Sequence, residues 1–410
     1  MNSTAALSPK SWAGAETYFP IILFLVFLAA MAISFSISGT LTAASIQRTQ
    51  DLWFDADTRR VFDNLTYRFS DHYRTSVHPL TSLLLSTPTI ILQSLGCSAE
   101  FAARITIAVG AGLLALTFFY LCTWIAGRVI DALVYTSLLV SSASFLCFAT
   151  VFELYAWGGF SILAALAGAT MGDRYKPAAL VIGSAVSLSF TVTNWMAGLA
   201  VAFWSVPIRR AVLYSALAFA AVAALSAIQS NLYPTSGKFL FLGEEQKYTK
   251  IDIREKVQTA PTAFLLDPII FPGVVSKISE QGKTILTAER PDGATNWLRT
   301  VASAVWLCLA GAGALAAWRV WSARGPSRQM APLVTGLIAG QLVLHLFYGD
   351  DGYFLYSLHF APLLILLASF ASATKWRMPC LGGAVVLVGL AGWNNLAGIK
   401  MAIQLLPVPQ

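Results

Sequence analysis

Residues 19–38 read FPIILFLVFLAAMAISFSIS, twenty positions without a charged side chain. A helix of about 20 apolar residues crosses the hydrocarbon core of a bilayer. A signal peptide would have a shorter apolar core and a cleavage site of small residues, so we predict a retained first membrane helix. Ten further apolar runs follow along the chain: 79–95, 103–125, 129–149, 153–171, 178–207, 211–231, 299–320, 331–348, 354–373 and 379–398.

The composition of the whole chain agrees with this pattern. Of 410 residues, 57% are hydrophobic and 11% are charged, whereas soluble proteins are roughly 45–50% apolar and about 25% charged. So few charges cannot cover the surface of a soluble protein of this length. This excludes a cytosolic enzyme, a disordered chain and a nucleic-acid-binding protein. The five cysteines have no CxxC or metal-ligand spacing, so we expect no disulfide framework and no metal cluster.

Basic residues indicate the orientation of the helices, because Lys and Arg collect in cytoplasmic loops. The run 79–95 has 17 residues and two prolines, so we predict an outer-face helix that does not cross. The run 178–207 is too long for one span and is interrupted by Thr191-Val-Thr-Asn-Trp195, which predicts two short helices meeting near the outer face. With these choices every basic cluster lies inside: Arg128, Arg174/Lys176, Arg209/Arg210, Arg319/Arg324/Arg328 and Lys375/Arg377. The excess of 27 basic over 20 acidic residues thus reports topology.

The sequence therefore predicts an all-α polytopic protein of the cell membrane, with about eleven transmembrane helices and a cytoplasmic N-terminus. Two polar stretches, 39–78 and 231–298, interrupt the apolar runs. We expect a transmembrane module at 1–230 that includes the outer loop 39–78, an outer-face loop or flap at 231–298, and C-terminal membrane helices at 299–410. Residues 243–256 have the pattern of an amphipathic helix. A flexible flap and a passive connector both fit the stretch 231–298.

The first outer loop carries the densest set of chemically active side chains. Asp55 and Asp57 lie one residue apart, and two such carboxylates can hold a divalent cation or supply a general base. Arg74 and His78 lie four residues apart at the start of the next apolar run, where they can clamp a phosphate. The loop also balances five acids against five arginines, which fits a solvated loop of salt bridges. Spacing alone leaves both interpretations open.

The order of these motifs resembles that of the GT-C glycosyltransferases, which include protein O-mannosyltransferases, the lipid A aminoarabinose transferase and the oligosaccharyltransferases. The resemblance rests on Asp55-Ala-Asp57 in the first outer loop, followed by Arg74-Thr-Ser-Val-His78-Pro-Leu at the next helix. Glu153 in Phe-Glu-Leu-Tyr resembles the second acidic position of that family. Motif similarity covers about 51–80, and the layout of helices covers most of the chain. Leu80 stands where many relatives have a second proline, so no single subfamily is assigned.

The resemblance implies a GT-C-like helical bundle with a helical first outer loop and an active site on the outer face. It implies transfer of a sugar from a polyprenyl-phosphate donor to an extracytoplasmic acceptor, which can be a glycan, a lipid or a protein, with inversion at the anomeric carbon. Asp55 would be the catalytic base. Asp57 and Glu153 would form hydrogen bonds to the acceptor or bind a divalent cation (Mg or Mn). The donor phosphate would be bound by Arg74, His78, Arg59 and Arg60.

Four more polar or aromatic residues are candidates for a substrate cavity: Asn194, Trp195, Tyr356 and His359. Asn194 and Trp195 also fit a capped turn with an interfacial tryptophan. The alternative function is a transporter or flippase of a lipid-linked or polar solute. A transporter would have paired broken helices and ionisable residues near the bilayer midplane. Here the acids crowd at the outer ends of the helices, which favours a site at the membrane surface.

Overall fold

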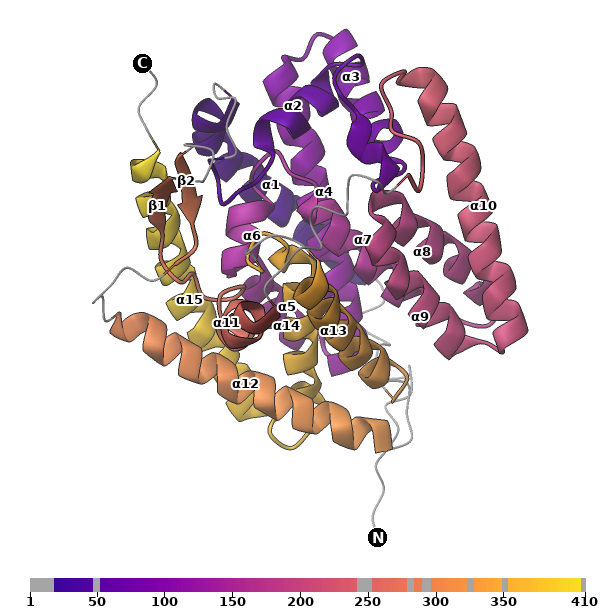
Figure 1. Cartoon of the computed structure of the whole chain (residues 1–410). Helices are drawn as coiled ribbons and strands as arrows, with labels where there is room; N and C mark the ends of the chain where they lie inside the picture. Colours follow the sequence, from indigo (N-terminus) through magenta and orange to yellow (C-terminus); the bar gives the residue numbers. More distant parts are fainter. Residues whose placement is uncertain are drawn as a thin grey trace.

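The computed structural model describes residues 18–46, 52–241, 253–278, 284–289, 296–322, 328–348 and 353–406, and they are almost entirely helical (Figure 1). Its elements in chain order are α1 (Phe19–Ile46), α2 (Thr58–Thr66), η2 (Tyr73–Ser76), η3 (Ser82–Ser86), α3 (Thr87–Ser94), α4 (Ala99–Ala126), α5 (Val129–Ser141), α6 (Ala143–Phe148), α7 (Tyr155–Gly168), α8 (Lys176–Phe190), η4 (Val192–Asn194), α9 (Trp195–Ser205), α10 (Ile208–Leu232), α11 (Ile253–Leu265), β1 (Val275–Ile278), β2 (Thr284–Thr287), α12 (Trp297–Ser322), α13 (Met330–Phe347), η7 (Ser357–His359), α14 (Ala361–Ser369), η8 (Phe370–Ala373) and α15 (Arg377–Leu405).

Six helices of the described residues are long and apolar enough to cross a bilayer, so the chain is a multi-pass membrane protein. They are α1, α4, α10, α12, α13 and α15. The predicted number of about eleven is not reached by this criterion, because several apolar runs form shorter helices. The run 129–149 is broken at Ser142, whose backbone is extended and whose hydroxyl accepts the Phe145 N–H at 3.3 Å to begin α6. The run 129–149 is therefore not one continuous helix.

The predicted division of 178–207 into two short helices is confirmed. Helix α8 ends at Phe190, Thr191 is extended, and α9 begins at Trp195 after the single turn η4. The run 79–95 forms a π-helical turn, η3, that continues into α3. The two together cover 82–94, and at 1.5 Å per residue they reach roughly 20 Å. This length is shorter than the hydrocarbon core of a bilayer.

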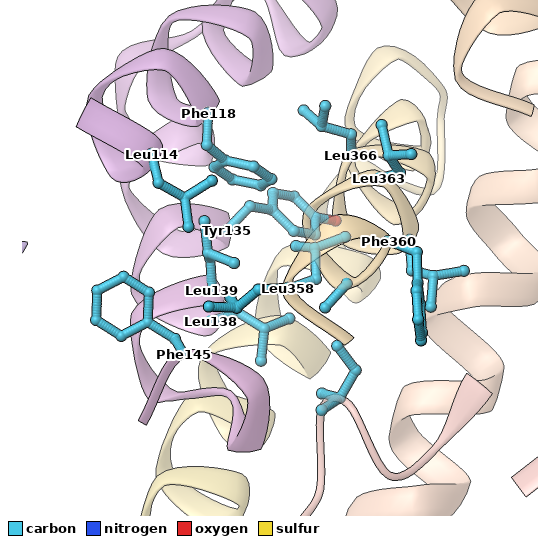
Figure 2. Packing of buried hydrophobic residues seen from close by; sticks show 14 of the residues in the cluster. Leu114, Phe118, Tyr135, Leu138, Leu139, Phe145, Leu358, Phe360, Leu363 and Leu366 are labelled. Carbon is cyan, nitrogen blue, oxygen red and sulfur yellow. The ribbon is translucent and has the colours of Figure 1, made fainter. Parts of the chain in front are cut away.

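Helix α4 forms the centre of the molecule and α1 lies on its outside (Figure 1). In the apolar stretch of α4, 72% of the residues are buried, against 17% in that of α1. Apolar residues exposed on a membrane helix face lipid, so α1 is peripheral. Figure 2 shows the core that α4, α5 and α14 form, through Leu114, Phe118, Tyr135, Leu138, Leu139, Phe360, Leu363 and Leu366.

The described part of the polar stretch 231–298 is built into this core. It contains α11 and a two-stranded antiparallel hairpin, β1–β2, which an all-helical prediction did not include. Asn395 of α15 accepts the Phe271 N–H at 2.7 Å and donates to the Ile269 carbonyl at 2.8 Å. The Leu286 N–H of β2 donates to the Leu52 carbonyl at 2.9 Å, which joins the hairpin to the first loop. The predicted amphipathic helix 243–256 lies outside the described residues except for the start of α11.

Candidate functional site

An acidic centre forms where the first loop meets the turn before α7. The Asp57 N–H donates to Glu153 Oε1 at 2.7 Å, and the Leu154 N–H donates to Glu153 Oε2 at 3.0 Å. Asp57 is the residue before the first turn of α2, and its carboxylate pairs with Arg60 one turn later in the same helix. Two segments that lie 96 residues apart in the chain thus share one site.

The carboxyl group of Glu153 has an unusual environment for an acid. Its side chain is 5% exposed, and it lies in the turn just before α7. The pKa of Glu153 is raised to about 7, mainly because the carboxyl group is buried. The negative charge of Asp57 also raises this pKa, and the positive charge of Arg60 lowers it by a smaller amount. Glu153 therefore changes its charge near neutral pH, which is the range that proton-transfer chemistry uses.

The turn that presents Asp55 has a strained backbone. Phe54 and Asp55 have φ angles of 50° and 62°, in the left-handed region that side-chain-bearing residues rarely adopt. The turn is held there by its neighbours: the Trp53 indole donates to the Cys147 carbonyl at 2.9 Å, and the Phe54 ring packs against Phe148 and other rings. Asp55 itself is exposed. Backbone strain of this kind costs roughly 1–3 kcal/mol and clusters at functional sites.

A polar pocket opens beside the acidic centre, and its lining is rich in basic groups. Its empty space, including its mouth, is about 340 Å³. Arg60 contributes to both the pocket and the acidic centre, while η2 supplies Arg74. The lining consists of Arg60, Val61, Asn64, Leu65, His72, Arg74, Thr75, His78, Thr81, Ser82, Ser86 and Leu154. Two guanidinium groups with hydroxyl and imidazole neighbours are a suitable set of donors for phosphate oxygens.

The state of His78 follows from its contacts. His78 Nδ1 lies 2.6 Å from the Phe190 carbonyl, which can only accept, so Nδ1 carries the proton. Burial lowers the pKa of His78 to about 3, and the positive charge of Arg74 acts in the same direction. His78 is therefore neutral at physiological pH, with the lone pair on Nε2. A negatively charged ligand in the pocket would favour the protonated imidazole.

A chain segment that follows α10 fixes one wall of the pocket. Its Gly237 N–H donates to the His72 carbonyl at 3.4 Å, and the Leu240 N–H donates to the Ser76 carbonyl at 3.1 Å. Any Cβ atom at Gly237 would collide with the Tyr73 carbonyl, so this close approach requires glycine. The His72 ring is held separately, with Nδ1 2.7 Å from the Ser82 hydroxyl.

An aromatic group lies on the other side of the acidic centre, and Tyr155 joins the two. The charges of Glu153 and Arg74 lie close enough to act on the Tyr155 hydroxyl. The Tyr155 ring lies 5.8 Å from both Tyr356 and His359. Tyr155 was not among the predicted site residues, although it stands two residues after Glu153 in Phe-Glu-Leu-Tyr.

His345 was also missed. It stacks on the Tyr356 ring at 4.9 Å from within α13, and neither of its buried ring nitrogens has a hydrogen-bond partner in the described parts of the chain. Its signal was available, because an ionisable side chain inside an apolar run is costly and usually functional. Lys256 of α11 donates to the His345 carbonyl at 3.1 Å and is likewise buried.

Of the predicted site residues, only Arg60, Arg74 and His78 line the pocket, and three of the others make contacts elsewhere. Arg59 pairs with Asp63 at 2.9 Å on the partly exposed side of α2, whereas Arg60, the next residue, faces the pocket. The Asn194 amide is buried and donates to the Gly158 carbonyl at 3.0 Å, which fastens the α8–α9 turn to α7. The Trp195 indole donates to the Ser184 hydroxyl.

No set of three or more His, Cys, Asp or Glu side chains suited to a metal ion occurs in the described ranges. Both oxygens of Glu153 accept backbone N–H groups and the Asp57 carboxylate pairs with Arg60. A carboxylate oxygen that accepts one hydrogen bond keeps a second lone pair, so Asp57 and Glu153 are still candidate ligands of a divalent cation.

No protein-family model matches the sequence, and a comparison with curated proteins finds no match either.

Proposed function

We propose that the protein is a membrane glycosyltransferase of the GT-C type, which moves a sugar from a polyprenyl-phosphate donor to an extracytoplasmic acceptor. The observation that carries this proposal is the 2.7 Å hydrogen bond between Asp57 and Glu153 beside a pocket lined by Arg60, Arg74 and His78. Carboxylates to handle the acceptor proton and cations to bind a phosphate are the two requirements of this transfer.

Arg60 and Arg74 bind the donor phosphate in this proposal. A sugar phosphodiester carries one negative charge, and the planar guanidinium group offers two parallel N–H donors that stay charged at any physiological pH. As the bond from the anomeric carbon to the phosphate oxygen breaks, the electron pair moves to the polyprenyl phosphate. The arginines stabilise the charge that develops there.

Asp55 is the base of the proposed reaction. Its side chain is exposed in the left-handed turn before α2, where it can approach an acceptor hydroxyl. Asp55 takes the proton of the acceptor hydroxyl, and the acceptor oxygen attacks the anomeric carbon from the side opposite the phosphate. One displacement without a sugar–enzyme intermediate inverts the anomeric centre.

Tyr155, Tyr356 and His359 line the sugar side of the site in this proposal. Tyrosine rings present both an apolar face and a polar tip, which suits a hydroxylated ring. The site would face the outside of the cell membrane, since the basic loops of the sequence favour the cytoplasm. The proposed mechanism assigns its steps to these side chains and gives none to a metal ion.

A transfer assay tests this function. The full chain in proteoliposomes is given radiolabelled polyprenyl-phosphate hexoses and pentoses with a cell-envelope acceptor fraction, and we expect label in the acceptor. Arg74→Ala should weaken donor binding at least tenfold, while Arg174→Ala, which removes an exposed arginine from the α7–α8 loop, should leave it unchanged. Solute flux without any sugar transfer would contradict the proposal and favour a transporter.

A further inference from the structure

The turn that carries His78 and Ser82 to the pocket is interrupted by a side chain from another helix. In an α-helix the Leu83 N–H would donate to the Pro79 carbonyl, four residues earlier. Here the Leu83 N–H donates to Gln229 Oε1 at 2.8 Å, and Gln229 Nε2 donates to the Pro79 carbonyl at 2.8 Å. The amide of Gln229 therefore stands in the place of one backbone hydrogen bond.

The helix widens directly after this insertion. The Thr87 N–H donates to the Ser82 carbonyl, five residues earlier, which makes η3 a π-helical turn. Insertion of a side chain into the ladder of backbone bonds is an established cause of helix distortion, and π-turns are frequent at functional sites. Ser82 and Ser86, the two ends of η3, both line the pocket. The wider turn thus sets where the pocket hydroxyls lie.

Gln229 is an unusual residue for its place in α10. It is fully buried within a helix that is apolar enough to span a membrane. An amide in such a helix is costly unless it is hydrogen-bonded across to another segment. Asn231, two residues later, is exposed and donates to the Ala227 carbonyl of its own helix. Gln229 is therefore hydrogen-bonded to the turn that lines the pocket, whereas Asn231 is bonded within α10.

The other side of the turn is fixed by α8. The Leu80 N–H donates to the Ser189 carbonyl at 3.0 Å, and His78 Nδ1 donates to the Phe190 carbonyl at 2.6 Å. The Val192 N–H donates to the Val77 carbonyl at 2.9 Å. The turn is held between α8 and α10, so the orientation of His78 depends on both.

We propose that Gln229 is a positioning residue of the pocket. By inserting its amide between Pro79 and Leu83, it holds the 78–86 turn at the width that directs His78 and Ser82 toward a phosphate-bearing lipid. Gln229 does not line the pocket and acts through the turn. The identity of the ligand rests on the proposed function.

Binding of polyprenyl phosphate without a sugar tests this role, because it needs no turnover. The full chain in nanodiscs is titrated with the lipid, and both the dissociation constant and the number of sites are measured. Gln229→Met keeps the length of the side chain but removes the amide, and we expect at least tenfold weaker binding with an unchanged number of sites. A merely structural role would lower the number of sites and leave the dissociation constant of the folded fraction unchanged, which would overturn the proposal. Asn231→Leu, the matched control, should bind within twofold of the wild type.

A second variant covers the case in which Gln229→Met does not fold. Gln229→Glu keeps the oxygen that accepts from Leu83 but loses the donor to Pro79, so we expect weaker binding than in the wild type. Equal affinity of the wild type and the Gln229 variants would overturn the positioning role. Weaker binding in the variants together with no sugar transfer by the wild type would support the positioning role and contradict the proposed function. A wild type that does not bind the lipid would contradict both.

Discussion

The protein pairs an aspartate with an arginine in two different settings, one buried and one partly exposed. On α5, Asp131 is fully buried, and both of its oxygens accept from Arg377 at 2.6 and 2.8 Å. In the loop between α1 and α2, Asp57 pairs with Arg60, but a second acid, Glu153, lies beside them and the arginine also faces a pocket. The first pair is complete in itself. The second has more acid than one arginine neutralises.

The difference separates a structural ion pair from a candidate site. One carboxylate matched by one bidentate arginine joins α5 to the start of α15 and leaves nothing for a ligand. At the second pair, burial is the main cause that raises the pKa of Glu153 to about 7; the charge of Asp57 adds to this rise and Arg60 opposes it. Titratable groups with a shifted pKa beside a polar pocket are candidates for a functional site. A bound substrate can supply the interactions that the protein itself does not provide there.

The largest expected effect is the loss of turnover when Asp55 is replaced. Asp55→Asn should lower transfer by about 10³-fold, because the general base is lost. Asparagine adopts the left-handed region more readily than most residues, so the thermal midpoint should stay the same or rise. The control is Asp71→Asn, at an exposed position of the same loop. Normal turnover in Asp55→Asn would remove Asp55 as the base.

Asp131→Asn should show the opposite behaviour. Removing one partner of a buried ion pair typically costs about 3–5 kcal/mol, so the thermal midpoint in detergent should fall by several degrees. Turnover per folded molecule should stay within twofold of the wild type. A large loss of turnover at an unchanged midpoint would place this pair in the active site and contradict its role as a structural ion pair.

The neighbouring arginines of α2, Arg59 and Arg60, should differ in their effect on donor binding. Arg60→Ala should raise the donor KM by about 30-fold, the equivalent of one charge-assisted interaction of about 2 kcal/mol. Arg59→Ala, which breaks the partly exposed pair with Asp63, should change the donor KM less than twofold. Steady-state kinetics at varied donor concentration measures both. Equal effects would mean that the pocket lining does not bind the donor.

The smallest effect is a dependence on pH. Glu153 is neutral below its pKa of about 7 and becomes anionic above it. The added charge beside Arg60 should raise the donor KM a few-fold between pH 6 and 8, and Glu153→Gln should abolish that change. The raised pKa also means that stability falls as pH rises from about 4.5 to about 7, because the unfolded state loses its proton first. A wild-type KM that is flat over this range would contradict the assigned environment of Glu153.

The sequence predicted the helical class and the break at Thr191–Trp195, because periodic apolar runs and polar interruptions are local signals. It also selected Asp57 and Glu153, which the structure joins by a hydrogen bond. The break at Ser142 was missed, since serine inside an apolar run also bonds to its own helix. Tyr155 and Gln229 were missed because their importance comes from segments far away in the chain. Such contacts leave no local pattern.

Photo-crosslinking tests directly whether the basic pocket binds the phosphate of the donor. A polyprenyl-phosphate sugar with a diazirine next to the phosphate is bound to the full chain, irradiated, and mapped by mass spectrometry. We expect adducts within residues 60–86 and at Leu154, which include the lining of the basic pocket, and we expect these adducts to be lost in Arg74→Ala. Adducts concentrated instead around Asp131 and Arg377, or unaffected by Arg74→Ala, would contradict this expectation.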